Sequence, residues 1–204
     1  MRYTGPKARR VRRQGTNLYG PEKYDRILQR KPHGPGKDPK ARRGKLSEYG
    51  EQLKEKQKAR DMFMITERQF QRIYDEASRA TGKTDVAMKQ MLERRLDNAI
   101  YKAGFARSRL QARQFAAHGL FKVNGQRVTV ASYRVSPGDK IAIREQTKGS
   151  PIFESILQGN ERYSPPAWIK SDPASLSFEV IAVPAEDQLE QAVDMRKVVE
   201  FYSR

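Results

Sequence analysis

The segment "ARSRLQARQFAAHGLFKVNGQRV" (residues 106–128) predicts a short helix followed directly by a tight β-hairpin. Ser108 and Gln111 have the spacing of a helix-capping box, and Gly119 is of the residue type that commonly ends a helix. The Asn-Gly pair at residues 124–125 separates two short β-type runs, which is the strongest local signal for a hairpin. Both elements have an apolar side, so we expect them to share a core.

The same stretch carries five cations and no acidic residue: Arg107, Arg109, Arg113, Lys122 and Arg127. Counting back from the turn places Lys122 opposite Arg127, and like charges in that position are unfavourable. Arg109 and Arg113 lie four residues apart on the predicted helix and repel each other as well. An ordinary solvated face usually mixes both signs of charge. Phosphate groups would relieve the repulsion, so we predict that these cations bind a polyanion.

The overall composition favours nucleic acid as that polyanion. The chain has 204 residues, a net charge of +17 and a pI of about 10.2. Such a basic chain is typical of nucleic-acid-binding proteins. No run approaches the ~18 apolar residues of a membrane-spanning helix. The large apolar residues opposite the charges are needed for a core, which disfavours a membrane surface. A helix-helix-hairpin module with a separate basic arm fits structured RNA better than duplex DNA.

The first part of the chain predicts a basic arm and then polar helices. Residues 1–45 are rich in proline and lack apolar periodicity, so we expect extended chain with one short helix near residues 22–30. Ser47 is the expected N-cap of a highly polar helix that reaches Arg60. The segment "TERQF" (residues 66–70) carries the next capping box, and that helix supplies an apolar stripe to the core.

The remaining elements complete an α+β protein. Apolar spacing predicts a continuous helix over residues 88–103, and β-strands are expected within residues 136–144 and 175–183. A last helix is predicted over residues 186–202, with Leu189, Val193 and Val198 on its apolar face.

We expect a mainly helical domain with an inserted module, a helix-turn-helix plus a small β-sheet, after an extended basic N-terminal arm. The expected limits are 1–45 for the arm, 46–92 for the helical domain, 184–204 for the C-terminal helix that completes it, and 93–183 for the inserted RNA-binding module.

Two segments resemble enzyme motifs but lack their context. The segment "ASRATGKT" (residues 77–84) has neither the first glycine nor the preceding strand of a phosphate-binding loop. Asp97 in "RRLD" resembles the catalytic aspartate of pseudouridine synthases, but we place it inside a helix. There is no cysteine, and His33 and His118 are too few for a histidine-based metal site. We predict no enzyme activity, no metal or cofactor, and no small-molecule substrate.

Residues 94–128, "RRLDNAIYKAGFARSRLQARQFAAHGLFKVNGQRV", resemble the RNA-binding module named after small-subunit ribosomal protein S-four. That module also occurs in tyrosyl-tRNA synthetases, pseudouridine synthases and a heat-shock ribosome-rescue protein. The flanking motifs resemble the bacterial or organellar S-four family itself: "RYTGPK" (2–7), "KLSEYGEQLKEKQKAR" (45–60), "TERQF" (66–70), "ASYRVSPGDKIAIRE" (131–145) and "VVEFYSR" (198–204).

The resemblance implies a structural protein of the small (30S) ribosomal subunit. Members of the family bind the 5′ domain of 16S rRNA early in assembly, contact proteins S-five and S-three, influence decoding accuracy and help to form the mRNA entrance. The positions that match the mRNA-contacting residues are Arg42, Arg43 and Lys45. The resemblance also implies a place in the cytoplasmic ribosome, with an organellar ribosome as the alternative. Many bacterial members hold zinc with four cysteines, which this chain lacks.

Further rRNA contacts are expected beyond residues 106–128. They come from the basic arm and from the first long helix, at Arg9, Arg10, Arg12, Arg13, Lys54, Lys56, Lys58 and Arg60. Two rivals use the same module: an RNA-modifying enzyme and a ribosome-associated rescue factor. The enzyme would need a catalytic domain, for which the 60 or so residues after Arg144 are too few.

Overall fold

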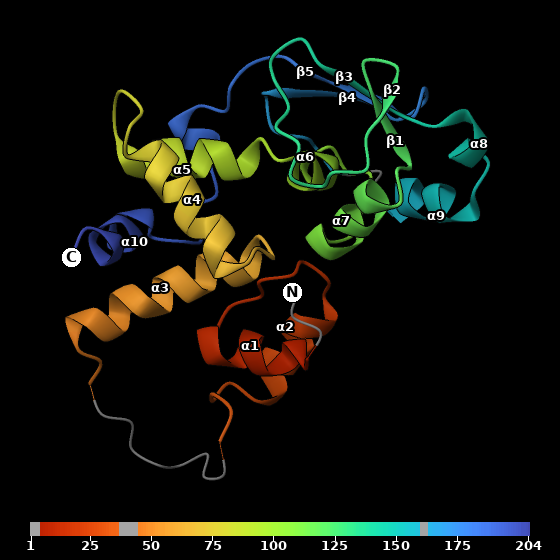
Figure 1. The fold of residues 1–204 in the computed structure, drawn as a ribbon. Coiled ribbons are helices and arrows are strands. Elements are labelled where there is room, and N and C mark those ends of the chain that lie inside the picture. The colour runs from red at the N-terminus through yellow and green to blue at the C-terminus, as the bar shows by residue number, and fades with distance from the viewer. Residues whose placement is uncertain (1–4, 37–44, 160–162) are drawn as a thin grey trace. The chain divides into compact units, whose positions relative to one another are not determined.

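The computed structural model describes three stretches of the chain, namely residues 5–36, 45–159 and 163–204. The chain forms two compact units, whose helices and strands are labelled in Figure 1. Unit 1 comprises the described residues up to Met88 together with Gln191–Arg204, and unit 2 lies within Lys89–Glu190. The predicted α+β class is confirmed, because unit 2 adds an antiparallel sheet to helices. Our finer division into arm, helical domain and module stays a proposal.

Two short helices, α1 (Lys7–Gln14) and α2 (Lys23–Arg30), lie in the segment that was expected to be mostly extended. The helix expected near residues 22–30 is present as α2, whereas α1 corrects the expectation of extended chain. The physical reason is a small apolar core that residue spacing did not reveal. It buries four side chains, Val11, Leu18, Tyr19 and Tyr24.

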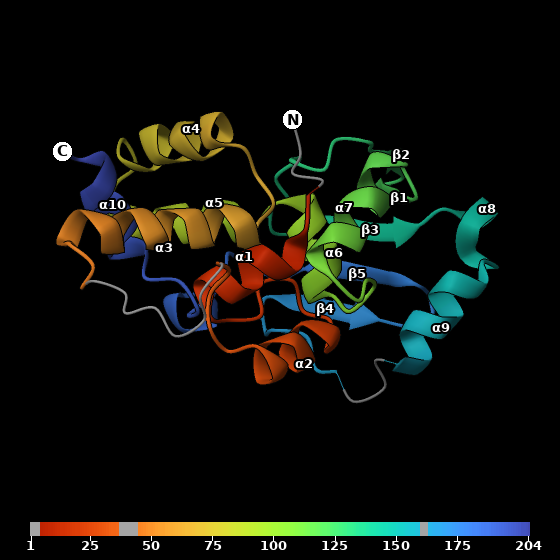
Figure 2. The same ribbon diagram turned by 90° about the horizontal axis from the view of Figure 1, so that it is seen from below.

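The helices α3 and α4 of unit 1 begin where their capping residues predicted. Ser47 Oγ accepts a hydrogen bond from Gly50 N at the start of α3 (Glu48–Met62). At the start of α4 (Glu67–Ala77), Thr66 and Gln69 form both hydrogen bonds of the capping box. The helix α10 (Met195–Tyr202) lies along α3, as Figure 2 shows. The sequence therefore predicted the starts of α3 and α4 correctly.

The C-terminal helix is shorter than predicted. A 3₁₀ turn, η1 (Glu186–Gln188), comes first, and α10 begins only at Met195. The Asp194 side chain accepts a hydrogen bond from Arg196 N and so caps α10 at this point. The expected apolar residues are buried nonetheless: Leu189, Val193 and Val198.

Unit 2 combines helices with a five-stranded antiparallel sheet in the order β2-β1-β3-β5-β4. The strands are β1 (Phe121–Val123), β2 (Gln126–Arg127), β3 (Lys140–Ile143), β4 (Ile169–Asp172) and β5 (Ser177–Val180). The helices are α6 (Leu96–Lys102), α7 (Arg109–Ala117), α8 (Glu145–Lys148) and α9 (Pro151–Gly159), while α5 (Thr84–Glu93) begins in unit 1. The sequence did not predict β4, α8 or α9.

The predicted hairpin is confirmed in its register. Lys122 pairs with Arg127 and Val123 with Gln126 across the turn. Asn124 has a φ of 49° and Gly125 a φ of 82°, the left-handed backbone that an Asn-Gly turn supplies. Gly119, with a φ of 67°, follows the end of α7 at the expected residue.

The continuous helix predicted for residues 88–103 is wrong, because α5 and α6 are separated at Arg94 and Arg95. Arg95 has extended backbone, with a ψ of 139°. Neighbouring backbone groups bond to a distant loop instead of continuing the helix, since Val135 N donates to Arg94 O and Leu96 N donates to Tyr133 O. These contacts are not visible in the spacing of apolar residues.

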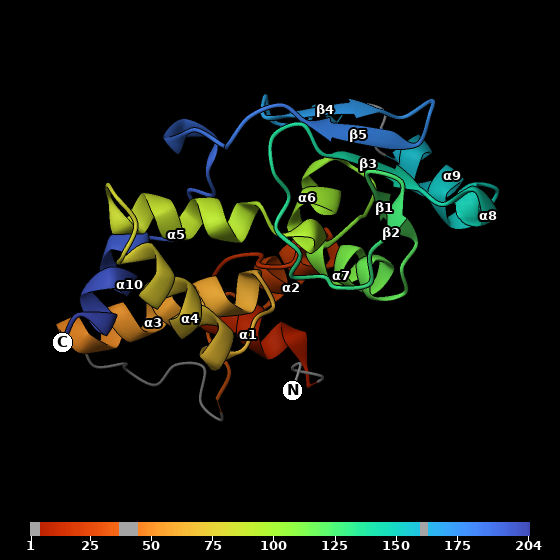
Figure 3. The same cartoon turned by 45° about the horizontal axis from the view of Figure 1, so that its top comes forward.

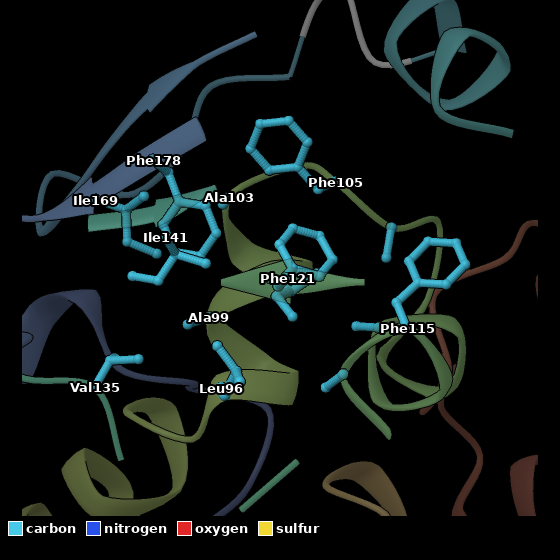
Figure 4. Packing of buried hydrophobic residues seen from close by; sticks show 14 of the residues in the cluster. Leu96, Ala99, Ala103, Phe105, Phe115, Phe121, Val135, Ile141, Ile169 and Phe178 are labelled. Atoms are coloured by element: carbon cyan, nitrogen blue, oxygen red, sulfur yellow. The ribbon is translucent and has the colours of Figure 1, made fainter. Parts of the chain in front are cut away.

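The core of unit 2 lies between one face of the sheet and the helices α6 and α7, which Figure 3 shows on the same side of the sheet. Phe105 stacks on Phe178 with ring centroids 5.9 Å apart and meets the edge of Phe121 at 6.4 Å. Figure 4 shows these rings with Leu96 and Ala99 of α6. The hairpin and α7 therefore share a core, as their apolar sides predicted. Among the described helices, none combines the length and apolarity needed to cross a membrane.

Candidate nucleic-acid interface

Arg109 is not an unpaired cation, as the sequence had suggested. Its side chain is buried, with 8% of the residue exposed. The guanidinium donates to Asn98 Oδ1 at 2.8 Å and to Glu190 Oε2 at 2.6 Å. It also lies over the Tyr101 ring, 4.8 Å from the centroid. Arg109 therefore joins α7 to α6 and to Glu190, the last residue of unit 2.

Arg113 is paired as well, with the carboxylate of Asp97. Its Nη1 lies 3.0 Å from Asp97 Oδ2, and the same carboxylate accepts two hydrogen bonds from Arg95, at 3.0 and 2.8 Å. The prediction that Arg109 and Arg113 are a repulsive pair without acids is wrong. Their acidic partners, Glu190 and Asp97, lie outside residues 106–128.

The Asp97 carboxylate is enclosed by Arg95 and Arg113 and is not exposed to a substrate. Only 3% of the residue is exposed, and its carboxylate also accepts a hydrogen bond from Asn98 N. The position that resembles the pseudouridine synthase aspartate thus orients two arginines. Nearby, burial raises the pKa of the Glu93 carboxyl against the opposing effects of Lys102 and Arg109.

The other three cations of residues 106–128 are less enclosed. Arg107 is exposed and donates from Nη2 to Ser155 O at 2.8 Å and to Ser155 Oγ at 2.6 Å. Arg127 is exposed, and Lys122 is half-buried opposite it on the sheet. Neither of these two forms an ion pair within the described part of the chain. The hairpin therefore presents the uncompensated charge that the sequence predicted.

The four arginines of α1 divide into two kinds. Arg10 pairs with Asp61 of α3, and Arg12 donates to His33 O at 3.1 Å and to Gly34 O at 3.3 Å. Burial raises the pKa of Asp61, although Arg10 opposes that shift. The other two, Arg9 and Arg13, are exposed and have no ion pair among residues 5–36, 45–159 and 163–204.

The cations of α3 are largely engaged with carboxylates. Lys56 and Arg60 each lie 2.8 Å from an oxygen of Glu67. Lys58 lies 3.5 Å from Glu55 Oε1. Lys54 is half-buried without an ion pair in the described residues. Most of the basic half of α3 therefore stabilises unit 1 itself.

Two of the three residues expected to contact mRNA, Arg42 and Arg43, lie outside the described residues. The third, Lys45, is exposed. Exposed cations that we did not predict are Arg68 and Arg72 on α4, and Arg79 just after it. The four-residue spacing of Arg68 and Arg72 on a predicted helix was the signal that could have identified them. The alternation in residues 136–144 predicts only a strand, so it does not identify Arg144, which directly follows β3, as a site residue.

Two family models together match residues 2–141. Residues 2–93 match the ribosomal protein S4/S9 N-terminal domain, and residues 94–141 match the S4 domain. The join between the models lies at Arg94, where α5 has just ended.

Relatives extend the similarity over the whole chain, and each is a protein called small ribosomal subunit protein uS4. The one from Natranaerobius thermophilus is 42% identical, covering 100% of this chain and 99% of the relative. The one from Pelotomaculum thermopropionicum is 44% identical with the same coverage, and that of Treponema denticola is 45% identical over 98% of this chain and 97% of the relative. The chain therefore belongs to the uS4 family, a family of small ribosomal subunit proteins and not of enzymes.

Proposed function

We propose that this chain is a structural constituent of the small ribosomal subunit and binds its rRNA directly. Full-length relatives that carry the name of a small-subunit protein support the assignment. The observation that carries it is a group of predicted contact residues that are exposed or half-buried and form no ion pair within the described residues. The group includes Arg9, Arg13, Lys54, Lys122 and Arg127. Phosphates would neutralise these charges and release counterions.

The remaining predicted contact residues take a second role in this proposal. Eight of them have protein partners: Arg10, Arg12, Lys56, Lys58, Arg60, Arg107, Arg109 and Arg113. Carboxylates offset the charges of six of them, which mainly hold α1, α3 and α7 in place. The other two, Arg12 and Arg107, bond neutral oxygen atoms and keep their positive charge. RNA then meets a preorganised set of free cations, which reduces the entropy lost on binding.

The finer role follows from the family resemblance. We propose that the chain binds the 5′ domain of 16S rRNA, nucleates its assembly and contacts proteins S-five and S-three. Arg42, Arg43 and Lys45 would line the mRNA entrance, and the contact with S-five would influence accuracy. The location is the cytoplasmic ribosome.

Fractionation of ribosomes tests the assignment. A tagged copy of the full chain should sediment with small subunits in stoichiometric amount and remain there in high-salt buffer, because a primary rRNA-binding protein is held by many contacts. Association with large subunits or stalled complexes alone would instead support a rescue factor. The same gradients probed with an antibody against another small-subunit protein provide the reference for stoichiometry.

A further inference from the structure

In the turn between α7 and β1, a side chain of β2 lies where a side chain at Gly119 would stand. Gly119 is buried and has a φ of 67°. A Cβ atom at this position would collide with Arg127 Nε and would lie 2.9 Å from Thr129 Cγ2. The missing side chain therefore allows the Arg127 guanidinium to lie against the backbone of the turn.

A second guanidinium reaches the same turn. Arg127 Nη2 donates to His118 O at 3.3 Å, and Arg144 Nη1 donates to the next carbonyl, Gly119 O, at 3.5 Å. The backbone also fixes Arg144, whose N–H donates to Leu120 O at 2.9 Å. These carbonyls end a helix and carry partial negative charge, which attracts both arginines. Figures 1 and 3 show the hairpin beside the end of α7.

The charges of the two arginines are not neutralised by carboxylates. Within the described residues neither forms an ion pair, and the remaining partner of Arg144 is the neutral amide of Gln146. Each guanidinium has five donor hydrogens, so several are left for another acceptor. Lys122 adds a third positive charge directly opposite Arg127. This turn thus differs from the Arg109 and Arg113 sites, where acidic residues are already in place.

We propose that the α7–β1 turn is a binding site for a backbone phosphate of RNA, formed by Arg127, Arg144 and Lys122. The planar guanidinium forks of two arginines match the oxygens of a phosphate group. Gly119 is the positioning residue, because it leaves the space that Arg127 occupies. The inference rests on the proposed RNA-binding function and adds to it a defined site and a cation, Arg144, that the sequence did not reveal.

Replacement of Arg144 tests the site. The full chain is titrated with a transcript of the 5′ domain of 16S rRNA at several salt concentrations. Arg144→Gln should weaken binding several-fold and reduce the slope of log affinity against log salt by about 0.7–0.9, the value for one phosphate contact. The matched control is Lys170→Gln on β4, the opposite edge of the sheet, which removes the same charge from an exposed position. It should change affinity and slope much less.

A second test uses the space at Gly119. Gly119→Ala should displace Arg127 and weaken binding about as much as Arg127→Ala. In the Arg127→Ala background, Gly119→Ala should cause little further loss of affinity, because the Arg127 guanidinium is gone and the neighbouring Thr129 methyl carries no charge. Urea unfolding of each variant checks that the fold persists. A further loss of affinity in the double variant, with the fold intact, would overturn the positioning role.

The possible outcomes distinguish failure of the proposed phosphate site from failure of the proposed RNA-binding function. Normal affinity and salt slope for Arg144→Gln, with weaker binding when Arg9 and Arg13 are replaced, would overturn the site and leave RNA binding standing. Equal losses for Arg144→Gln and Lys170→Gln would also overturn it, since only net charge would then matter. If replacement of the free cations anywhere in the chain leaves binding unchanged, the proposed function itself fails.

Discussion

Glu67 accepts hydrogen bonds from side chains of two other helices in unit 1. Lys56 Nζ and Arg60 Nη1 of α3 each lie 2.8 Å from its carboxylate, and the Tyr202 hydroxyl of α10 donates at 2.6 Å. Tyr202 also stacks on Tyr74 of α4, with centroids 4.9 Å apart. The single carboxylate therefore ties α10, close to the C-terminus, to α3 and α4.

This geometry predicts a pH-dependent stability. Burial acts to raise the pKa of Glu67, but hydrogen bonds from Lys56 and Tyr202 outweigh it, so the net shift is downward from 4.5. A lowered carboxyl pKa stabilises the fold fully above about pH 4.5, and the gain is lost as the pH falls through the folded-state value. Glu67→Gln should cost about 1 kcal/mol at pH 7, allowing for partial exposure of the carboxylate, and much less near pH 3.

Urea unfolding at the two pH values measures this difference. Glu22→Gln is the matched control, because Glu22 belongs to an exposed pair with Arg26 on α2. The control should change stability little at either pH. A loss for Glu67→Gln that is equally large at pH 3 and pH 7 would show that the carboxylate charge is not responsible.

At the residue scale, the sequence predicted local pairings and missed distant ones. The bond from Gln69 to Thr66 and the pairing of Lys122 with Arg127 involve residues close in the chain, so spacing alone identified them. The acids that neutralise Arg109 and Arg113 come from other elements. A charge pattern read within 23 residues could not include Glu190.

At the scale of elements, the hairpin is joined to β3 through Asn124. Its N–H donates to Lys140 O at 2.8 Å, its Oδ1 accepts from Lys140 N at 2.9 Å, and its Nδ2 donates to Asp139 Oδ1 at 2.8 Å. Asn124 therefore adopts the left-handed backbone of the turn and also bonds the neighbouring strand. Strand β3 was predicted from its own alternation, whereas this link depends on tertiary structure.

Asn124→Ala and Asn124→Gly separate the two contributions. Alanine loses the side-chain bonds and also strains the left-handed backbone, so we expect a loss of about 2–3 kcal/mol. Glycine tolerates the φ of 49° and should lose about 1 kcal/mol less. Chemical denaturation measures both values. Equal losses for the two variants would mean that backbone strain contributes nothing here.

Capping residues made some element boundaries predictable, although the cap of α10, Asp194, was not recognised. Ser47 and Thr66 mark helix starts that the structure confirms. The break between α5 and α6 depends on backbone bonds with the loop around Val135, and β4 exists because it pairs with β5. Residue spacing carries no information about such partners, so these features were missed.

At the scale of the whole molecule, the 41 lysines and arginines overstate the charge available for binding, because 24 acidic residues reduce the net charge to +17. Many arginines and lysines stabilise the fold through acidic partners. The free charges occur in both units, with Arg9 and Arg13 on α1 in unit 1 and with Lys122 and Arg127 on the hairpin in unit 2. We expect one rRNA domain to contact both sets at once.

Combining substitutions from the two units tests that expectation. Arg9→Gln with Arg13→Gln should reduce the salt slope by about 1.5, and so should Lys122→Gln with Arg127→Gln, because each pair removes two phosphate contacts. The quadruple variant should lose as much binding free energy as the two double variants together, since the pairs lie on separate units and share no partner. Titration of the 5′-domain transcript measures all three variants. If one pair accounts for the entire loss, RNA engages a single unit, and the charges on the other must serve a different contact.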